Sequence, residues 1–179
     1  HPYYTVKDTF GVAVFMTIFL GIVFFVPELG GWFLEKDNFA PADILQTPPD
    51  IVPLWYLTPY YSILRAVTFE WLPGGAKLWG VIAMGAAIVM FFFLPWLDRA
   101  KVRSIRYRGW MYKTALTLFA VTFVLLGYLG TKNPGHVDLF LFKNVVWAQI
   151  GLVVYFAFFL LMPIYTRFDP TKPEPDRVG

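Results

Sequence analysis

Residues 78–97 read LWGVIAMGAAIVMFFFLPWL, an apolar stretch without a single charged side chain. Crossing ~30 Å of hydrocarbon as a helix takes about 20 residues, so this stretch is long enough to span a membrane. Residues 9–27, 114–131 and 144–166 are likewise uncharged and apolar. Helices of a soluble protein would need polar faces for water, which these stretches lack. We therefore predict an all-α membrane protein with four transmembrane helices, forming one membrane domain over residues 1–179.

The composition supports a membrane protein and excludes several kinds of chemistry. Apolar residues make up 58% of the chain and charged residues 15%, against roughly 45–50% and about 25% in average soluble domains. The chain has no cysteine, so disulfides and thiolate-ligated metals are excluded, and its only histidines are His1 and His136. No phosphate loop, serine triad or metal-ligand spacing is present, and we predict no metal site. The start at His1 suggests a fragment, a processed chain or half of a longer polypeptide.

Charge placement predicts the orientation of the spans. The loop 98–113 carries six basic residues and one acid, whereas the segment 28–77 carries six acids and three bases. Because basic loops stay on the cytoplasmic side, we expect the loop 98–113 inside, the segment 28–77 outside and both termini inside. A patch for lipid headgroups or nucleic acid would have a similar composition. Topology accounts for the charges, and we predict no nucleic-acid partner.

Four glycines lie within the predicted second and third spans. Gly80, Gly85, Gly127 and Gly130 have no side chain, so neighbouring helices can approach closely at these positions. We assign them a packing role.

The long segment between the first and second spans is rich in aromatic residues, unlike a disordered linker. Residues 47–56 read TPPDIVPLWY, and the prolines fix an extended or tightly turned path. After Pro59 a short helix can form, which would place Leu57, Tyr60, Tyr61 and Leu64 on one face. This helix could form a wall for a lipid-soluble ligand, or it could be a structural cap over the helix ends.

Three stretches resemble cytochrome b, and their order and spacing match those of the family. Residues 1–8, HPYYTVKD, resemble the opening of the family's fifth helix; residues 47–56 resemble its proline-rich quinol-site loop; and residues 60–65, YYSILR, resemble the short helix that follows. The resemblance covers nearly the whole chain. It implies the C-terminal half of cytochrome b in a quinol:cytochrome c oxidoreductase. The fourth span favours the respiratory type over photosynthetic complexes, in which this half is a separate three-span subunit.

The resemblance also implies two quinone sites. At the inner face, Lys7 and Asp8 match positions that act on quinone carbonyl oxygens. At the outer face Leu54 stands where the family usually has a glutamate that accepts a proton, so Asp50, through water, is the candidate base, with Tyr61 as hydrogen-bond partner. The implied outer quinol-binding residues are Ile51, Pro53, Leu54, Tyr56, Leu57 and Tyr61.

The same resemblance implies cofactors and partners. Two b-type haems with paired histidine ligands need four imidazoles within spans, so they should belong to the N-terminal half of cytochrome b. Ubiquinone and ubiquinol are the expected substrates. A Rieske iron–sulfur protein and a c-type cytochrome are the expected partners, in a dimeric complex. We expect a bacterial inner membrane rather than a mitochondrial one.

Two alternatives stay open at this point. The first is a non-catalytic membrane anchor or assembly subunit on the same scaffold, which the Leu54 departure favours. The second is a small transporter or channel. The absence of charged residues inside the predicted spans is evidence against transport, because transport routes usually need polar groups within the membrane.

Overall fold

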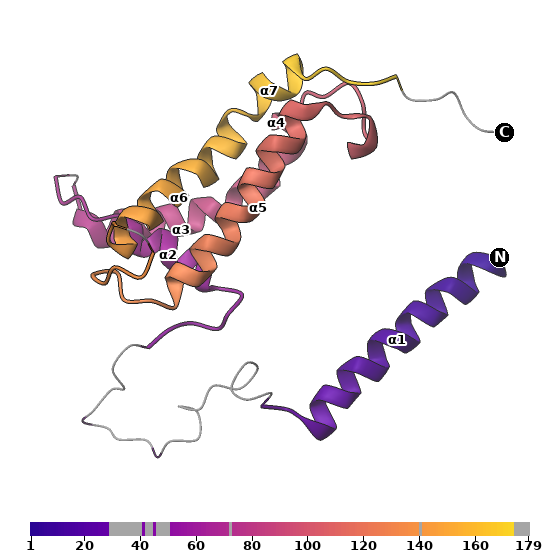
Figure 1. Cartoon of the computed structure of the whole chain (residues 1–179), viewed down its shortest axis with the longest axis horizontal. Helices are drawn as coiled ribbons and strands as arrows, with labels where there is room; N and C mark the ends of the chain where they lie inside the picture. Colours follow the sequence, from indigo (N-terminus) through magenta and orange to yellow (C-terminus); the bar gives the residue numbers. More distant parts are fainter. Residues whose placement is uncertain (29–40, 42–44, 46–50, 72, 140, 174–179) are drawn as a thin grey trace. The chain divides into compact units, whose positions relative to one another are not determined.

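The computed structural model describes residues 1–28, 41, 45, 51–71, 73–139 and 141–173. Within these residues the protein is all-α, and one isolated β-bridge, between Leu139 and Phe142, forms no sheet. The chain divides into two compact units, His1–Ile51 and Val52–Gly179 (Figure 1).

The first unit contains one long helix, α1 (Tyr3–Phe25), which has no buried residue. Its apolar side chains lie on all sides, as suits a helix surrounded by lipid or by other membrane helices. The helix begins at Tyr3, earlier than the predicted span 9–27, because Pro2 fits the start of a helix. The hydroxyls of Thr9 and Thr17 donate to carbonyls four residues earlier, so the helix satisfies its own polar groups.

The second unit contains the remaining spans. By length and composition, α1 of the first unit and the helical runs Gly75–Leu97 and Trp110–Gly130 of the second can each cross a membrane. The bent helix pair Asn144–Leu160 and Met162–Phe168 supplies a fourth crossing if it is one span. The predicted all-α membrane fold is therefore confirmed. The elements of this unit are α2 (Thr58–Ala66), α3 (Gly75–Val89), η3 (Met90–Phe93), α4 (Leu94–Leu97), η4 (Ile105–Tyr107), α5 (Trp110–Gly130), α6 (Asn144–Leu160) and α7 (Met162–Phe168).

One proline lies near the end of the second span, where Gly75–Leu97 is still one span, and another breaks the fourth. Pro95 lies in the first turn of α4, and the preceding turn η3 is a 3-10 helix. Pro163 lies in the first turn of α7, which is bent by 56° from α6. Proline has no N–H and its ring clashes with the carbonyl four residues earlier, so an α-helix cannot continue unbroken through it. The stretch 144–166, predicted as one uninterrupted span, is thus a broken helix.

The core of the second unit lies where α2, α5 and α6 meet. Ile63, Leu126, Tyr155 and Phe159 are fully buried there. The ring of Phe119 is central to an aromatic cluster, with its centroid 4.4 Å from that of Phe158. Stacked and edge-on rings of this kind add to the packing energy between helices.

We expect Tyr155→Phe to lower the stability of the unit. The Tyr155 hydroxyl donates to the carbonyl of Ala87 on α3 at 2.9 Å, and a buried interhelical hydrogen bond of this kind contributes about 1 kcal/mol. The measurement is the thermal melting of the purified protein in its membrane assembly. Tyr128→Phe, at an exposed position of α5, is the matched control. Equal melting of the two variants would contradict the assignment.

Close backbone contacts hold α2 against two spans. A Cβ at Gly130 would lie 2.2 Å from the Thr58 carbonyl oxygen, and a Cβ at Gly80 would lie 2.6 Å from that of Leu64. The predicted packing role is therefore confirmed at these two positions. At Gly85 a Cβ would meet no described atom within 4 Å, and at Gly127 the contact is an ordinary 3.5 Å to Pro59.

The helix α2 and the basic loop 98–113 lie at opposite ends of this bundle (Figure 1). At the α2 end, α5 finishes and α6 begins. At the other end, the carboxylate of Asp169 accepts hydrogen bonds from the backbone N–H groups of Gly109 at 2.7 Å and Met111 at 3.1 Å. The Thr166 hydroxyl accepts another from the N–H of Arg99. The loop is therefore fastened to the end of α7.

Candidate ligand-binding site

The helix α2 has one face in the core and one face open. Its buried residues are Thr58, Pro59, Ser62, Ile63 and Ala66. The sequence pattern placed Leu57, Tyr60, Tyr61 and Leu64 on the opposite face, and here Leu57 is exposed and the other three are half-buried. The short helix predicted after Pro59 is thus confirmed, and its apolar face remains accessible.

The turn before α2 is held by its own backbone. The N–H of Leu57 donates to the Leu54 carbonyl at 2.8 Å, and the Thr58 hydroxyl donates to the Trp55 carbonyl at 2.7 Å. The side chains of Leu54, Trp55 and Tyr56 are exposed, whereas Pro53 is half-buried. A fixed turn that exposes apolar and aromatic side chains next to the open face of α2 extends the same surface.

Arg65 anchors the end of α2 and stacks on Tyr61. Its Nη2 donates to the Lys132 carbonyl at 2.7 Å and its Nη1 to the Gly130 carbonyl at 3.4 Å. Its guanidinium carbon lies 4.9 Å from the centre of the Tyr61 ring. Arg65 therefore fixes the ring orientation and binds carbonyls at the end of α5, where a positive charge is favoured. Sequence reasoning gave Arg65 no role, although the i, i+4 spacing from Tyr61 was a usable signal.

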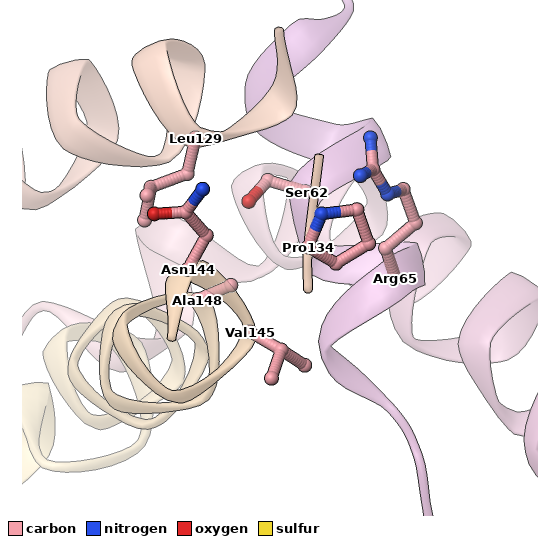
Figure 2. A pocket seen from close by; sticks show the side chains of 7 residues that line it. All are labelled: Ser62, Arg65, Leu129, Pro134, Asn144, Val145 and Ala148. Atoms are coloured by element: carbon pink, nitrogen blue, oxygen red, sulfur yellow. The ribbon is translucent and has the colours of Figure 1, made fainter. Parts of the chain in front are cut away.

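The buried face of α2 packs against the corner where the end of α5 meets the start of α6. Ser62 and Arg65 of α2, Leu129 of α5 and Asn144 of α6 are among the residues that line a small cavity of about 10 Å³ (Figure 2). A cavity of this size holds about one water molecule. The corner gives α2 little room to move, so the open face keeps its position.

Asn144 joins that corner to the turn between α5 and α6. It is 1% exposed, and its Nδ2 donates to the Asn133 carbonyl and to Asp138 Oδ2, both at 2.8 Å. Its Oδ1 accepts from the N–H of Asp138. The buried Asn144 amide therefore orders the turn that follows Lys132, whose carbonyl accepts from Arg65.

Tyr60 connects the open face to the core. Its ring lies edge-on to that of Phe123, with centroids 5.8 Å apart. Burial raises the pKa of Tyr60 above its usual value of 10.0, and a side-chain hydrogen bond with Tyr155 partly offsets this effect. The phenol therefore stays neutral at physiological pH.

Three of the other predicted site residues belong to the first unit. Lys7 and Asp8 are exposed on α1 in the first unit, and the Lys7 ammonium lies 4.6 Å from the centre of the Tyr3 ring. Ile51, the last residue of that unit, is exposed. Asp50 lies outside the described residues, as do residues 47–49 of the proline-rich loop.

The histidines do not fit a bis-histidine haem site. His1 precedes α1, where its Nδ1 lies 2.8 Å from Thr5 Oγ1, and His136 lies in the turn before α6. Two imidazoles at these positions cannot supply paired axial ligands to two haems. Among the described residues no group of three or more His, Cys, Asp or Glu side chains could hold a metal ion.

Comparison with known proteins identifies the family. The family model described as Cytochrome b(C-terminal)/b6/petD matches residues 41–156. The chain is 50% identical over 178 residues to a cytochrome b of Allochromatium vinosum and 43% identical over 176 residues to one of Rhodospirillum rubrum. These alignments cover 99% and 98% of this chain but 41% and 39% of the relatives, so the chain spans about two fifths of their length.

A solved structure has the same fold. A chain of "Hyperthermophilic respiratory Complex III" matches with a TM-score of 0.76 and 32% sequence identity, over 94% of this chain and 38% of that chain. Sequence and fold agree along almost the entire chain. This protein therefore belongs to the cytochrome b(C-terminal)/b6/petD family.

Proposed function

We propose that this chain is the quinone-site-bearing C-terminal part of cytochrome b in a respiratory quinol:cytochrome c oxidoreductase. The relatives named cytochrome b and the Complex III neighbour support this assignment. The observation that carries it is the open apolar face of α2, fixed from behind by close backbone contacts and by Arg65. A rigid apolar wall that carries the phenol hydroxyl of Tyr61 suits the ring of a quinol.

At the outer site this chain binds and orients the ubiquinol ring. Oxidation removes two electrons and two protons from its hydroxyl groups. Leu57 and Pro53 form an apolar wall for the ring. Three further residues extend this wall: Ile51, Leu54 and Tyr56. The Tyr61 hydroxyl is the hydrogen-bond partner of a ring oxygen. In the assembled complex the Rieske iron–sulfur protein, and the b haems that the N-terminal half would hold, would accept the two electrons.

The proton acceptor of the outer site is the point at which this sequence departs from its family. The Leu54 side chain cannot accept a proton, so we assign that role to Asp50, through a water molecule. A general base contributes typically 10²–10⁴-fold to a rate. We expect Asp50→Asn to lower the rate of quinol oxidation at least tenfold, measured as haem b reduction in a rapid-mixing experiment. Asp43→Asn, in the same acidic segment, is the control, and an unchanged rate in Asp50→Asn would remove Asp50 from the mechanism.

At the inner site Lys7 and Asp8 act on quinone. Both are exposed on α1. Reduction of quinone consumes two electrons and two protons; the Lys7 ammonium donates a hydrogen bond to one carbonyl oxygen, and protons reach the ring oxygens through these two side chains. Proton uptake at the inner face and release at the outer face together translocate protons across the membrane.

The remaining parts of the proposed complex lie outside this chain. They are the haem-bearing N-terminal half of cytochrome b, the Rieske protein and a c-type cytochrome, in a dimer in the bacterial inner membrane. The basic loop 98–113 then faces the cytoplasm, as do both termini. The separation of this loop from α2 within the second unit is compatible with that orientation.

A non-catalytic anchor or assembly subunit is the second candidate, and Leu54 is the observation that favours it. One experiment separates the two functions: purification of the complex through this chain, a reduced-minus-oxidised spectrum, and quinol:cytochrome c turnover with and without a quinol-site inhibitor. We expect co-purifying b haem and inhibitor-sensitive turnover. Haem without turnover would indicate a degenerate outer site, and absence of haem and partners would favour the anchor.

A further inference from the structure

Two buried polar side chains line the small cavity of about 10 Å³ behind α2. They are Ser62 of α2 and Asn144 of α6, and Leu129 of α5 lies beside them (Figure 2). Ser62 is 2% exposed and Asn144 is 1% exposed. Both side chains can therefore complete their hydrogen bonds only within the protein or with a molecule held in the cavity.

The hydroxyl of Ser62 lacks the partner that a helical hydroxyl usually has. Serine and threonine side chains in a helix can donate to the carbonyl four residues earlier, as Thr17, Thr117 and Thr166 do at 2.8, 2.9 and 2.6 Å. The Ser62 hydroxyl makes no such bond, nor any other within the part of the chain that the structure describes. Burying an unpaired hydroxyl is costly, so an acceptor from a small molecule is expected.

Asn144 has one acceptor position left. Both hydrogens of its Nδ2 are used, by the carbonyl of Asn133 and by Asp138 Oδ2. Its Oδ1 accepts from the N–H of Asp138 and has a second lone pair. Only an NH₂ group can serve the carbonyl of Asn133 and the carboxylate together, so the orientation of the amide is fixed. Asn144 can therefore accept one more hydrogen bond but cannot donate one.

The size of the cavity and the polar groups around it favour water over an ion. A volume of about 10 Å³ holds about one water molecule. Arg65 also lines the cavity, and its positive charge disfavours a cation. An anion would need donors on every side, whereas Asn144 has only an acceptor left. Water both accepts and donates, so it can satisfy Ser62 and Asn144 at once.

We infer that this cavity holds one ordered water molecule, which accepts a hydrogen bond from the Ser62 hydroxyl and donates one to the Asn144 amide. The water ties α2 to α6 behind the open face that carries Tyr61. Ser62 is thus a positioning residue that acts on this face through the water. The effect on quinol binding rests on the proposed function, whereas the presence of the water does not.

The first measurement is cryo-electron microscopy of the complete complex, at a resolution that shows ordered water, for the wild type and for Ser62→Ala. We expect one water peak within hydrogen-bond distance of Ser62 and Asn144 in the wild type, and its loss in Ser62→Ala. Thr131→Ala removes an exposed hydroxyl at the end of α5 and should keep the peak. No peak in the wild type, or an undiminished peak in Ser62→Ala, would overturn the inference.

A second pair of variants tests the cavity and leaves the Ser62 hydroxyl in place. Val145→Leu adds one methylene at the wall of the cavity, whereas Val146→Leu makes the same change at the next residue, which does not line it. We expect only Val145→Leu to displace the water, and this pair decides the matter if Ser62→Ala fails to assemble. A water peak that remained in Val145→Leu would contradict its assignment to this cavity.

Quinol oxidation by the same variants tests the positioning role. A bridging water is nearly as favourable as a direct hydrogen bond, so we expect Ser62→Ala and Val145→Leu to raise the KM for quinol about threefold, with kcat unchanged. Thr131→Ala and Val146→Leu should keep both constants. Loss of the water with an unchanged KM would overturn the positioning role. If the water is present but the wild-type complex does not oxidise quinol, the proposed function fails and the water site stands.

Discussion

Gly130→Val is expected to abolish quinol oxidation and to lower the melting temperature of the complex. Even the first carbon of a side chain at this position would lie 2.2 Å from the Thr58 carbonyl oxygen, which is backbone and cannot rotate away. The start of α2 must therefore separate from α5, and overpacking of this kind typically costs about 1–3 kcal/mol. Because Thr58 adjoins Leu57 and the turn at Leu54, the open face of α2 moves with it.

The control for this prediction lies one helical turn earlier. At Gly127 an added Cβ would meet Pro59 at 3.5 Å, an ordinary contact, so Gly127→Ala should retain both turnover and melting temperature. The measurements are inhibitor-sensitive turnover and thermal melting of the purified complex. Normal turnover in Gly130→Val would mean that the position of α2 does not control quinol oxidation.

Arg65→Gln is expected to give the second largest effect. It removes a charged donor from two carbonyl groups and a cation from the Tyr61 ring. A hydrogen bond from a charged group contributes about 1.5–3 kcal/mol, so we expect a clear fall in melting temperature. The Tyr61 ring also loses its support, so the KM for quinol should rise about tenfold.

A lysine at position 65 tests whether the effect depends on the positive charge or on the planar shape of the guanidinium. Arg65→Lys keeps the cation but has no planar fork, and we expect it to recover part of the stability and less of the quinol affinity. Lys132→Gln removes a neighbouring charge without touching the two carbonyl contacts, and should leave KM unchanged. A KM that is normal in Arg65→Gln would contradict the role of Arg65 in orienting Tyr61.

The helices could be predicted from the sequence because uncharged apolar stretches of about 20 residues have few alternatives. The short helix α2 and its two faces followed from Pro59 and from i, i+3, i+4 spacing. The break in the fourth span was missed, although Pro163 was the signal. Apolar composition alone made this span look continuous.

The contacts that fix the site could not be predicted in the same way. Arg65 binds carbonyls at Gly130 and Lys132, and these partners depend on how α2 crosses α5. In the sequence, Gly130 and Gly85 are both glycines within an apolar span. Of these two, only Gly130 lies against the backbone of a neighbouring described element. Pairwise contacts between distant segments are set by tertiary packing, which a single sequence records weakly.

The most direct test of the central claim is photolabelling of the complete complex with an azido-ubiquinone, followed by peptide mapping of α2. We expect labels on Leu57, Tyr61 or Leu64, absent from Ser62 and Ile63, and removed by excess ubiquinol. Labelling of the buried face, or an unlabelled α2 in a complex that turns over normally, would contradict it.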